Sequence, residues 1–380
     1  MNRDEAHRIV RETFRNSFDK GRFRYFIKNL LVGLDESKAF PLLRGQYIYE
    51  PFRPRIKQYE RIGTYTDPDG MKIDVLIVYL QKQTTLDYGR TTQRNFIARY
   101  LKERGEKDAG LVAFVSPDSE DWRFSLVRMD YRLTSTPKGA PKAALDFTPA
   151  RRWSFLVGSR ENSHTVQSRL VPVMIEPDSD RPTLSRLEDI FNIETVTREF
   201  FEKYRELFLR TREILDTIVS ANPMVAGDLA AKGVNTVDFS KKLLGQIVFL
   251  YFLQKKGWFG VERDADWGTG PRDFLRELFE RKHCTYKNFF NDILEPLFYQ
   301  ALRQDRRDDD DHYDKLNCKI PFLNGGLFDP IGGYDWVHTD IFFPNELFSN
   351  EEKTKEGDTG DGILDIFDRY NFTVKEDEPL

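Results

Sequence analysis

The sequence predicts an α/β domain over residues 1–178, followed by an all-α domain over residues 184–380. The first part contains apolar runs with strand character, such as KIDVLIVYL, whereas apolar residues recur at helical spacing in the second part. Between them the segment PDSDRPT, residues 177–183, interrupts any regular pattern with prolines and small polar residues. A chain of 380 residues with 39% hydrophobic content is long enough for two domains with cores of their own.

The first domain is expected to begin with helical structure over residues 6–31, which carries an apolar face late in the segment. An extended run then ends at the turn DPDG, residues 67–70, where proline fixes one φ angle and glycine accepts a positive one. The strand KIDVLIVYL leaves this turn, and TTQRNFIARYLKERG predicts an amphipathic, basic helix. GLVAFV, RFSLVRMDY and residues 153–157 are the remaining predicted strands.

The second domain is predicted to consist of helices. An apolar stripe follows residues 196–215, and residues 238–259 are apolar on nearly all sides, which is typical of a helix at the centre of a helical core. Two later stretches, FLRELF and FFNDILEPLFYQAL, are also predicted to be helical. The run RRDDDD at residues 306–311 invites a metal site, but consecutive acids point in different directions, so a solvated loop is the preferred interpretation.

Composition excludes several classes of protein. The formal net charge is -4, so any surface for nucleic acid must be local. The two cysteines, Cys284 and Cys318, have no zinc-site spacing and are typical of a reducing compartment. The first residues lack the apolar run of a signal peptide, and the longest apolar segment, residues 243–253, is too short to span a bilayer. We therefore expect a cytoplasmic protein with no membrane partner.

One residue of the strand KIDVLIVYL does not fit its surroundings. Asp74 stands in a strand that is otherwise apolar on both faces, as expected when a sheet is covered on both sides. Burying a carboxylate without a partner would cost several kcal/mol. Asp74 must therefore be paired with a basic side chain, hydrated in a cleft, or bound to a cation.

Two long segments of the sequence resemble parts of a known protein family. YERIGTYTDPDGMKIDVLIVYL followed by RTTQRNFIARYLK is similar to the N-terminal region of type IIG restriction-modification enzymes, which fuse a nuclease-like domain, a helical connector and an adenine-specific DNA methylase. KKLLGQIVFLYFLQKKGWFG and FLNGGLFDP resemble the connector. The resemblance implies a PD-(D/E)XK nuclease-like mixed sheet in residues 1–178, double-stranded DNA as partner, and DNA cleavage that depends on Mg²⁺.

The nuclease pattern requires an aspartate on one strand, then a carboxylate and a lysine two residues apart on the antiparallel neighbour. Under the resemblance the catalytic candidates are Asp74, Lys82 and Gln93, and the metal ligands are Asp74 and Asp69, with Asp67 as another source of a ligand. Asp74 and Lys82 share a strand face, but eight extended residues span roughly 26 Å, too far for one metal site unless the strand breaks. Two interpretations stay open: an active site around Asp74, or a nuclease-like fold whose catalysis has decayed or been rearranged.

Basic residues are the candidates for DNA binding. Arg90, Arg94 and Lys102 lie on the predicted basic helix, and Arg151 and Arg152 precede the last strand of the first domain. Phosphate contacts are additive and tolerant of geometry, so the cluster is a stronger candidate than any single member. The alternative for each residue is an ordinary solvated side chain.

No part of the chain resembles a methylase. It has neither a glycine-rich cofactor loop after a strand nor an NPPY-type motif, so S-adenosylmethionine, a cofactor of the full-length family, is not expected to bind. We therefore expect a fragment or a split gene product, whose partner would be a separate methylase domain or subunit. Three functions stay open: a Mg²⁺-dependent endonuclease, a non-catalytic module that binds DNA or docks a methylase, and an unrelated helical scaffold.

Overall fold

The chain folds into two compact units, Met1–Val196 and Thr197–Val374. The predicted boundary at residues 177–183 differs from this division, because helix α5 (Leu184–Ile190) packs into the core of the first unit. Residues 176–180 lie outside the described part of the chain. The computed structural model describes residues 1–82, 86, 89–105, 107–129, 150–175, 181–323, 325–354, 358–370 and 372, with backbone only at 193–194, and also the backbone of 131–134 and 144–147.

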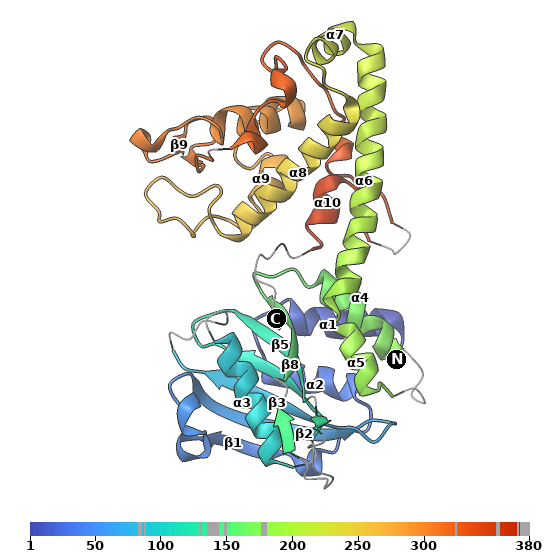
Figure 1. Cartoon of the computed structure of the whole chain (residues 1–380), viewed down its shortest axis with the longest axis vertical. Helices are drawn as coiled ribbons and strands as arrows, with labels where there is room; N and C mark the ends of the chain where they lie inside the picture. Colours follow the sequence, from blue (N-terminus) through green and yellow to red (C-terminus); the bar gives the residue numbers. More distant parts are fainter. Residues whose placement is uncertain are drawn as a thin grey trace. The chain divides into compact units, whose positions relative to one another are not determined.

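The first unit is an α/β fold built on a mixed six-stranded sheet, as the sequence predicted (Figure 1). The strand order is β1-β2-β3-β4-β5-β8, in which β3 and β4 are parallel and all other neighbours are antiparallel. A separate two-stranded ribbon pairs β6 with β7. The strands are β1 Phe40–Arg44, β2 Ile56–Thr66, β3 Lys72–Leu80, β4 Ala109–Val115, β5 Asp121–Arg128, β6 Tyr131–Thr134, β7 Ala144–Phe147 and β8 Arg151–Gly158.

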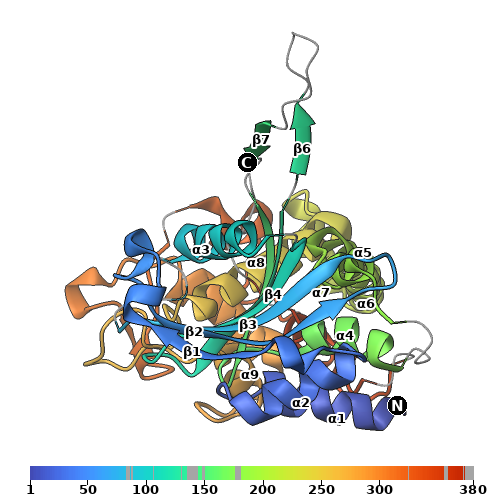
Figure 2. The ribbon, with the colours of Figure 1, turned by 90° about the horizontal axis from the view of Figure 1, so that it is seen from below.

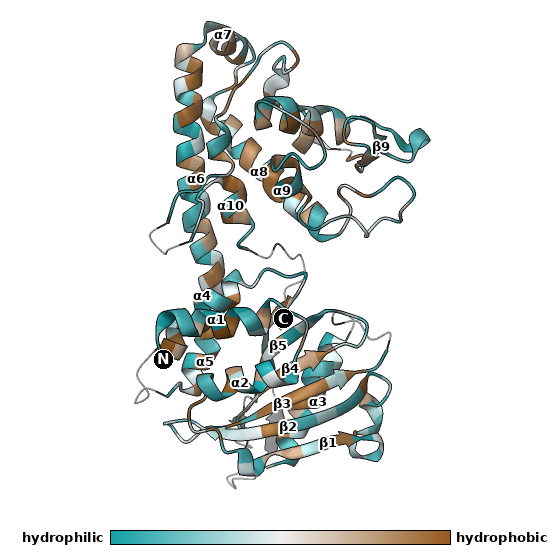
Figure 3. Cartoon of the chain, turned by 180° about the vertical axis from the view of Figure 1, so that it is seen from behind, coloured by the Kyte–Doolittle hydropathy of each residue, from teal (hydrophilic) through white to brown (hydrophobic). Residues whose placement is uncertain are grey.

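The turn between β2 and β3 has the predicted geometry. The Asp67 N–H donates to the Met71 carbonyl, and the Gly70 N–H donates to the Asp67 carbonyl, at 2.9 and 3.0 Å. Gly70 has φ +83°, a value that side chains disfavour, so glycine is favoured at this position. The turn sends β3 back along β2, and Figure 3 shows how apolar residues are concentrated along β3.

Helices cover both faces of the sheet, which explains why β3 is apolar on both sides (Figure 2). Helix α3 (Arg90–Glu103) connects β3 to β4 and packs on one face with its predicted apolar stripe. Helices α1 (Arg3–Phe14), α2 (Lys20–Leu30), α4 (His164–Ile175) and α5 pack on the other face. The predicted continuous helix over residues 6–31 is thus two helices, because the Asp19 side chain accepts a hydrogen bond from the Arg22 N–H and starts a new one.

The second unit is mainly helical. Its α8 is the central helix predicted from the sequence, with buried leucines and an isoleucine at its core, and Gly257 follows it at φ +68°. The segment FFNDILEPLFYQAL is helical as predicted, and it contains two π-helical turns, Phe290–Leu294 and Leu297–Ala301. Among the described residues, no helix has the length and apolar content needed to cross a membrane. The helices are α6 Ile193–Ala221, α7 Pro223–Ala231, α8 Thr236–Lys255, α9 Phe274–Phe279 and α10 Ile363–Phe367, and a short pair joins β9 His312–Tyr313 to β10 Cys318–Lys319.

Candidate functional site

Asp74 is fully buried on β3 and lies at the centre of a polar network on the α3 face of the sheet. Its carboxylate accepts hydrogen bonds from the Tyr100 hydroxyl of α3 and the Thr64 hydroxyl of β2, each at 2.7 Å. Oδ2 lies 3.0 Å from Arg61 Nη1, and Oδ1 lies 3.3 Å from Lys107 Nζ. We call Asp74 and these four partners the Asp74 network.

The Asp74 network holds an ionised carboxylate in a closed site. Burial acts to raise the pKa of Asp74, but the hydrogen bonds from Tyr100, Thr64 and Arg61 outweigh it and keep that pKa below its usual value. Burial, assisted by the charge of Asp74, raises the pKa of Tyr100, so its hydroxyl stays a donor. A carboxylate offers about four acceptor positions, and four donors already lie around Asp74. A metal ion would have to displace them.

No second carboxylate stands beside Asp74 on the neighbouring strands. β2 carries one acid, Glu60, whose carboxylate is 2.6 Å from Lys20 Nζ of α2 and 3.4 Å from the Tyr79 hydroxyl. Tyr79 and α2 belong to the opposite face of the sheet from the Asp74 network. Within the described residues, no group of three or more His, Cys, Asp or Glu side chains could hold a metal ion.

The other predicted catalytic and metal-binding residues do not converge on Asp74. β3 pairs with β4 without interruption from Ile73 to Tyr79, and the exposed Lys82 follows the far end of β3, so the strand break that would join Lys82 to Asp74 is absent there. Asp69 is exposed on the turn. Asp67 is buried, but its carboxylate accepts the N–H groups of Met71 and of Leu184 at the start of α5, at 2.8 and 2.7 Å. The structure therefore gives Asp67 a structural role.

Gln93 and Arg152 are also internal. Their side chains are 1% and 5% exposed, and Arg152 Nη1 donates to Gln93 Oε1 at 3.1 Å and to the Arg90 carbonyl at 3.0 Å. These bonds connect β8 to the first turn of α3. The geometry therefore does not support Gln93 as the residue that holds an attacking water, or Arg152 as a DNA contact. Arg151, by contrast, is exposed at the start of β8.

Basic side chains, most of them exposed, gather instead on α3 and its C-cap and on residues 44–57, which lead from the end of β1 into β2. Arg55 Nη1 donates to Thr92 Oγ1 at 3.1 Å, and Phe96 packs against Tyr49 and Phe52, so the two segments lie side by side. Residues 44–57 and 90–104 together contain nine Lys or Arg and two acids, Glu50 and Glu103. We call this the basic surface: Arg44, Arg53, Arg55, Lys57, Arg90, Arg94, Arg99, Lys102 and Arg104.

The basic surface differs in sign from the chain as a whole, whose net charge is -4. Arg94 and Lys102 of α3 lie on it as the sequence predicted, with Arg94 partly and Lys102 fully exposed. Arg53 and Lys57 are exposed as well, and no carboxylate among the described residues pairs with either. Such a surface attracts a polyanion through local charge, which the composition alone did not reveal.

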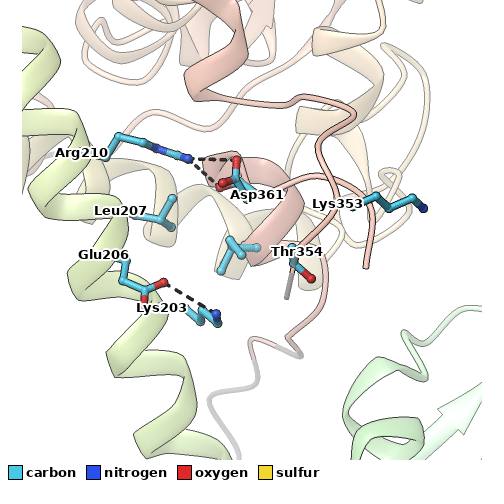
Figure 4. Close-up of a pocket in the computed structure, with 8 residues that line it drawn as sticks. Lys203, Glu206, Leu207, Arg210, Lys353, Thr354 and Asp361 are labelled. Carbon is cyan, nitrogen blue, oxygen red and sulfur yellow. Dashed lines mark hydrogen bonds and ion pairs between the residues drawn. The ribbon is translucent and has the colours of Figure 1, made fainter. Parts of the chain in front are cut away.

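The helical unit contains a pocket of ≈ 390 Å³ whose walls carry three cations (Figure 4). Arg210 Nη1 pairs with Asp361 at 2.9 Å, and Lys203 pairs with Glu206 at 3.7 Å. The amino group of Lys353 points away from the other two cations. Because the positive charges are either paired within the wall or diverge, this pocket is a weaker candidate than the basic surface.

Sequence reasoning found Asp74 but missed the residues that pair with it. Arg61 lies 13 positions before Asp74 and Lys107 lies 33 positions after it, and no spacing rule connects either residue to the carboxylate. The only sequence signal was the general need of a buried carboxylate for a partner. In comparisons with known proteins, no protein family, curated protein or solved structure matches this chain.

Proposed function

We propose that this chain is a non-catalytic module of a type IIG-like restriction-modification system, in which the α/β unit binds duplex DNA and the helical unit serves as a connector. The observation that carries the proposal is the Asp74 network. The carboxylate expected to hold Mg²⁺ is closed off by two cations and two hydroxyl groups. The PD-(D/E)XK-like ancestry of the α/β unit is part of this proposal.

Three features support binding without cleavage. The mixed sheet and the helix that follows β3 and packs beside Asp74 agree with the nuclease-like architecture that the sequence resemblance implies. A nuclease centre needs an ion with open coordination positions for water and phosphate, whereas Asp74 has no exposed surface. The basic surface supplies positive charge without needing a metal, and phosphate contacts tolerate imperfect geometry.

Binding is tested by fluorescence anisotropy with a labelled DNA duplex at several salt concentrations. We expect affinity to fall steeply with salt, and the slope of log K against log salt to decrease by about one for each phosphate-contacting residue removed. The test variant replaces three residues of the basic surface that are at least partly exposed, and the control removes the same charge from α1 and its C-cap residue on the opposite face of the sheet. The substitutions are Lys57→Ala, Arg94→Ala and Lys102→Ala for the test, and Arg8→Ala, Arg11→Ala and Arg15→Ala for the control.

Equal losses of affinity in the two triple variants would mean that overall charge, and not the basic surface, governs DNA binding. Catalysis is tested by incubating the chain with supercoiled plasmid and Mg²⁺. We expect no nicking above the level seen with EDTA. Nicking that requires Mg²⁺ and copurifies with the chain would overturn the non-catalytic assignment and leave DNA binding intact.

A further inference from the structure

We infer that Arg104 is a phosphate-binding residue of the basic surface, held in position by a stack that runs from the Asp74 network through Arg61 and Phe40. This inference rests on the proposed DNA binding. It gives the Asp74 network a function, which is to hold the guanidinium group of Arg104 in place at the surface. Phe40 is then a positioning residue, and Arg104 is the residue that touches DNA.

The stack is defined by two guanidinium groups around one ring. The Arg61 Cζ lies 4.9 Å from the centroid of the Phe40 ring, and the Arg104 Cζ lies 5.2 Å from the same centroid. Arg104 is also 5.8 Å from the centroid of the Tyr100 ring. Guanidinium groups at such distances from aromatic rings are attracted by the negative face of the ring. Phe40 therefore connects a partly buried arginine to an exposed one.

The inner end of the stack is fixed on several sides. Arg61 Nη1 bonds to Asp74 at 3.0 Å, and its Nε donates to the Lys38 carbonyl at 2.7 Å. The Tyr100 hydroxyl lies 3.3 Å from Arg61 and donates to Asp74 at 2.7 Å. Because the carboxylate is fully buried, these bonds are protected from competition by water. Arg61 consequently provides a rigid support for Phe40.

The outer end is exposed to solvent, where Arg104 also forms a side-chain hydrogen bond with Tyr59. Arg104 follows the last turn of α3, its side chain is exposed, and no carboxylate among the described residues forms an ion pair with it. The guanidinium group presents a rigid fork of donors that matches two phosphate oxygens. A free arginine side chain loses rotamer entropy when it binds, and stacking before binding reduces that loss.

Arg99 provides a matched control on the same helix. It is also exposed and also stacks on an aromatic ring, with its Cζ 4.7 Å from the centroid of Tyr49. Its Nε, however, is 2.8 Å from the carboxylate of Glu103, which offsets its charge. Comparison of Arg99 with Arg104 thus separates an exposed, stacked arginine that forms a direct ion pair with an acid from one that forms no such pair among the described residues.

The inference is tested with the full chain and the same labelled duplex. We expect Arg104→Ala to lower the magnitude of the salt slope by about one and to weaken binding, with a clearly smaller effect from Arg99→Ala. Arg104→Lys keeps the charge and should retain the slope. Phe40→Leu should weaken binding by about two- to fivefold with an unchanged slope, because it removes the cation–π contact that holds Arg104 on this ring. Phe40→Tyr keeps the ring and should restore the affinity.

The possible outcomes distinguish a failure of this inference from a failure of the proposed DNA binding on which it rests. Absence of salt-dependent binding by the unaltered chain refutes the proposed DNA binding, and the inference falls with it. Salt-dependent binding that is unchanged in Arg104→Ala refutes the inference alone. Equal affinities for Phe40→Leu and the unaltered chain refute the positioning role of the ring. Hydrogen exchange of β3 and β4 in each variant establishes that the sheet is intact, so that a folding defect is not counted as lost binding.

Discussion

The substitution Asp74→Asn separates a structural carboxylate from a metal ligand. Asparagine has nearly the same shape, so the change leaves no cavity and acts through charge and hydrogen bonding alone. In the structure it would remove the negative charge that pairs with Arg61 and Lys107, and would place an amide group opposite donors that now point at a carboxylate. We therefore expect Asp74→Asn to destabilise the α/β unit.

The size of the loss follows from burial. Removing one member of a buried ion pair costs about 3–5 kcal/mol, because the remaining charge stays desolvated. The side chains of Arg61 and Lys107 are 14% and 15% exposed, so water partly screens them once Asp74 is neutral. Asparagine also keeps one acceptor for Thr64 or Tyr100. These two effects place the expected loss at the lower end, about 3 kcal/mol.

The measurement must report on one unit, because a chain with two compact units need not unfold in one step. Native-state hydrogen exchange of peptides from β3 and β4 meets this need and gives the free energy of opening for that sheet. Asp69→Asn is the control, since Asp69 is an exposed acid on the nearby turn and its loss should change the stability of the sheet by less than about 0.5 kcal/mol.

The pH dependence gives a second readout of the same residue. The pKa of Asp74 is below its ordinary value of 3.8, so the folded state holds the ionised form more tightly than the unfolded state. Its contribution to stability is thus fully present above pH 3.8 and is lost as the pH falls through the lower folded value. This acid-side loss should be absent in Asp74→Asn. If the Asn variant is as stable as the unaltered chain at neutral pH, or more stable, the ionised carboxylate is destabilised by its surroundings. That result is expected of a metal ligand without its metal and would refute the ion-pair role.

Two further predictions concern buried groups that do not belong to the Asp74 network. Arg152→Met should destabilise the α/β unit by about 1–3 kcal/mol, because Gln93 and the Arg90 carbonyl lose a donor. The salt slope of DNA binding should stay unchanged. A lower slope with intact stability would instead make Arg152 a DNA contact. Burial raises the pKa of Glu295 to about 9 although Tyr334 donates to it at 2.6 Å, so the stability of the helical unit should fall between pH 4.5 and about 9 as the unfolded chain ionises first. Glu295→Gln should remove this decline in hydrogen exchange of peptides around residues 290–301, and a decline that persists in the Gln variant would assign it to another group.

Much of the first unit could be predicted because its signals are local. The turn at residues 67–70, the β-branched strand after it and the apolar stripe of α3 each depend on neighbours within a few positions, and each is found where it was predicted. The boundary between the two units was harder to predict from the sequence. The prolines at residues 177–183 interrupt local periodicity, but α5 is assigned to the first unit by its packing on the sheet, which is a long-range contact. Periodicity does not report such contacts.

The site was predicted less completely for the same reason. The nuclease pattern predicted site residues from one segment of the sequence, namely acids, a lysine and a glutamine. The strand β3 is continuous, however, so residues at its two ends cannot share a metal. Gln93 and Arg152 form a hydrogen bond with each other inside the protein, although a glutamine and an arginine in this region had suggested contacts with water and phosphate. Charged and amide side chains satisfy one another when they are buried, and only the packing of α3 against β8 reveals that they are.

Burial finally distinguishes two roles that look identical in the sequence. An aspartate in an apolar strand can be a metal ligand or an ion-pair partner, and in both cases its neighbours must compensate its charge. A metal ligand in a nuclease must also keep one side open, because the ion has to bind water and a phosphate oxygen during the reaction. Asp74 has no exposed surface, and its four donors come from β2, from α3 and from the segment before β4. These donors fix three elements around one charge, which is the arrangement expected of an ion-pair partner.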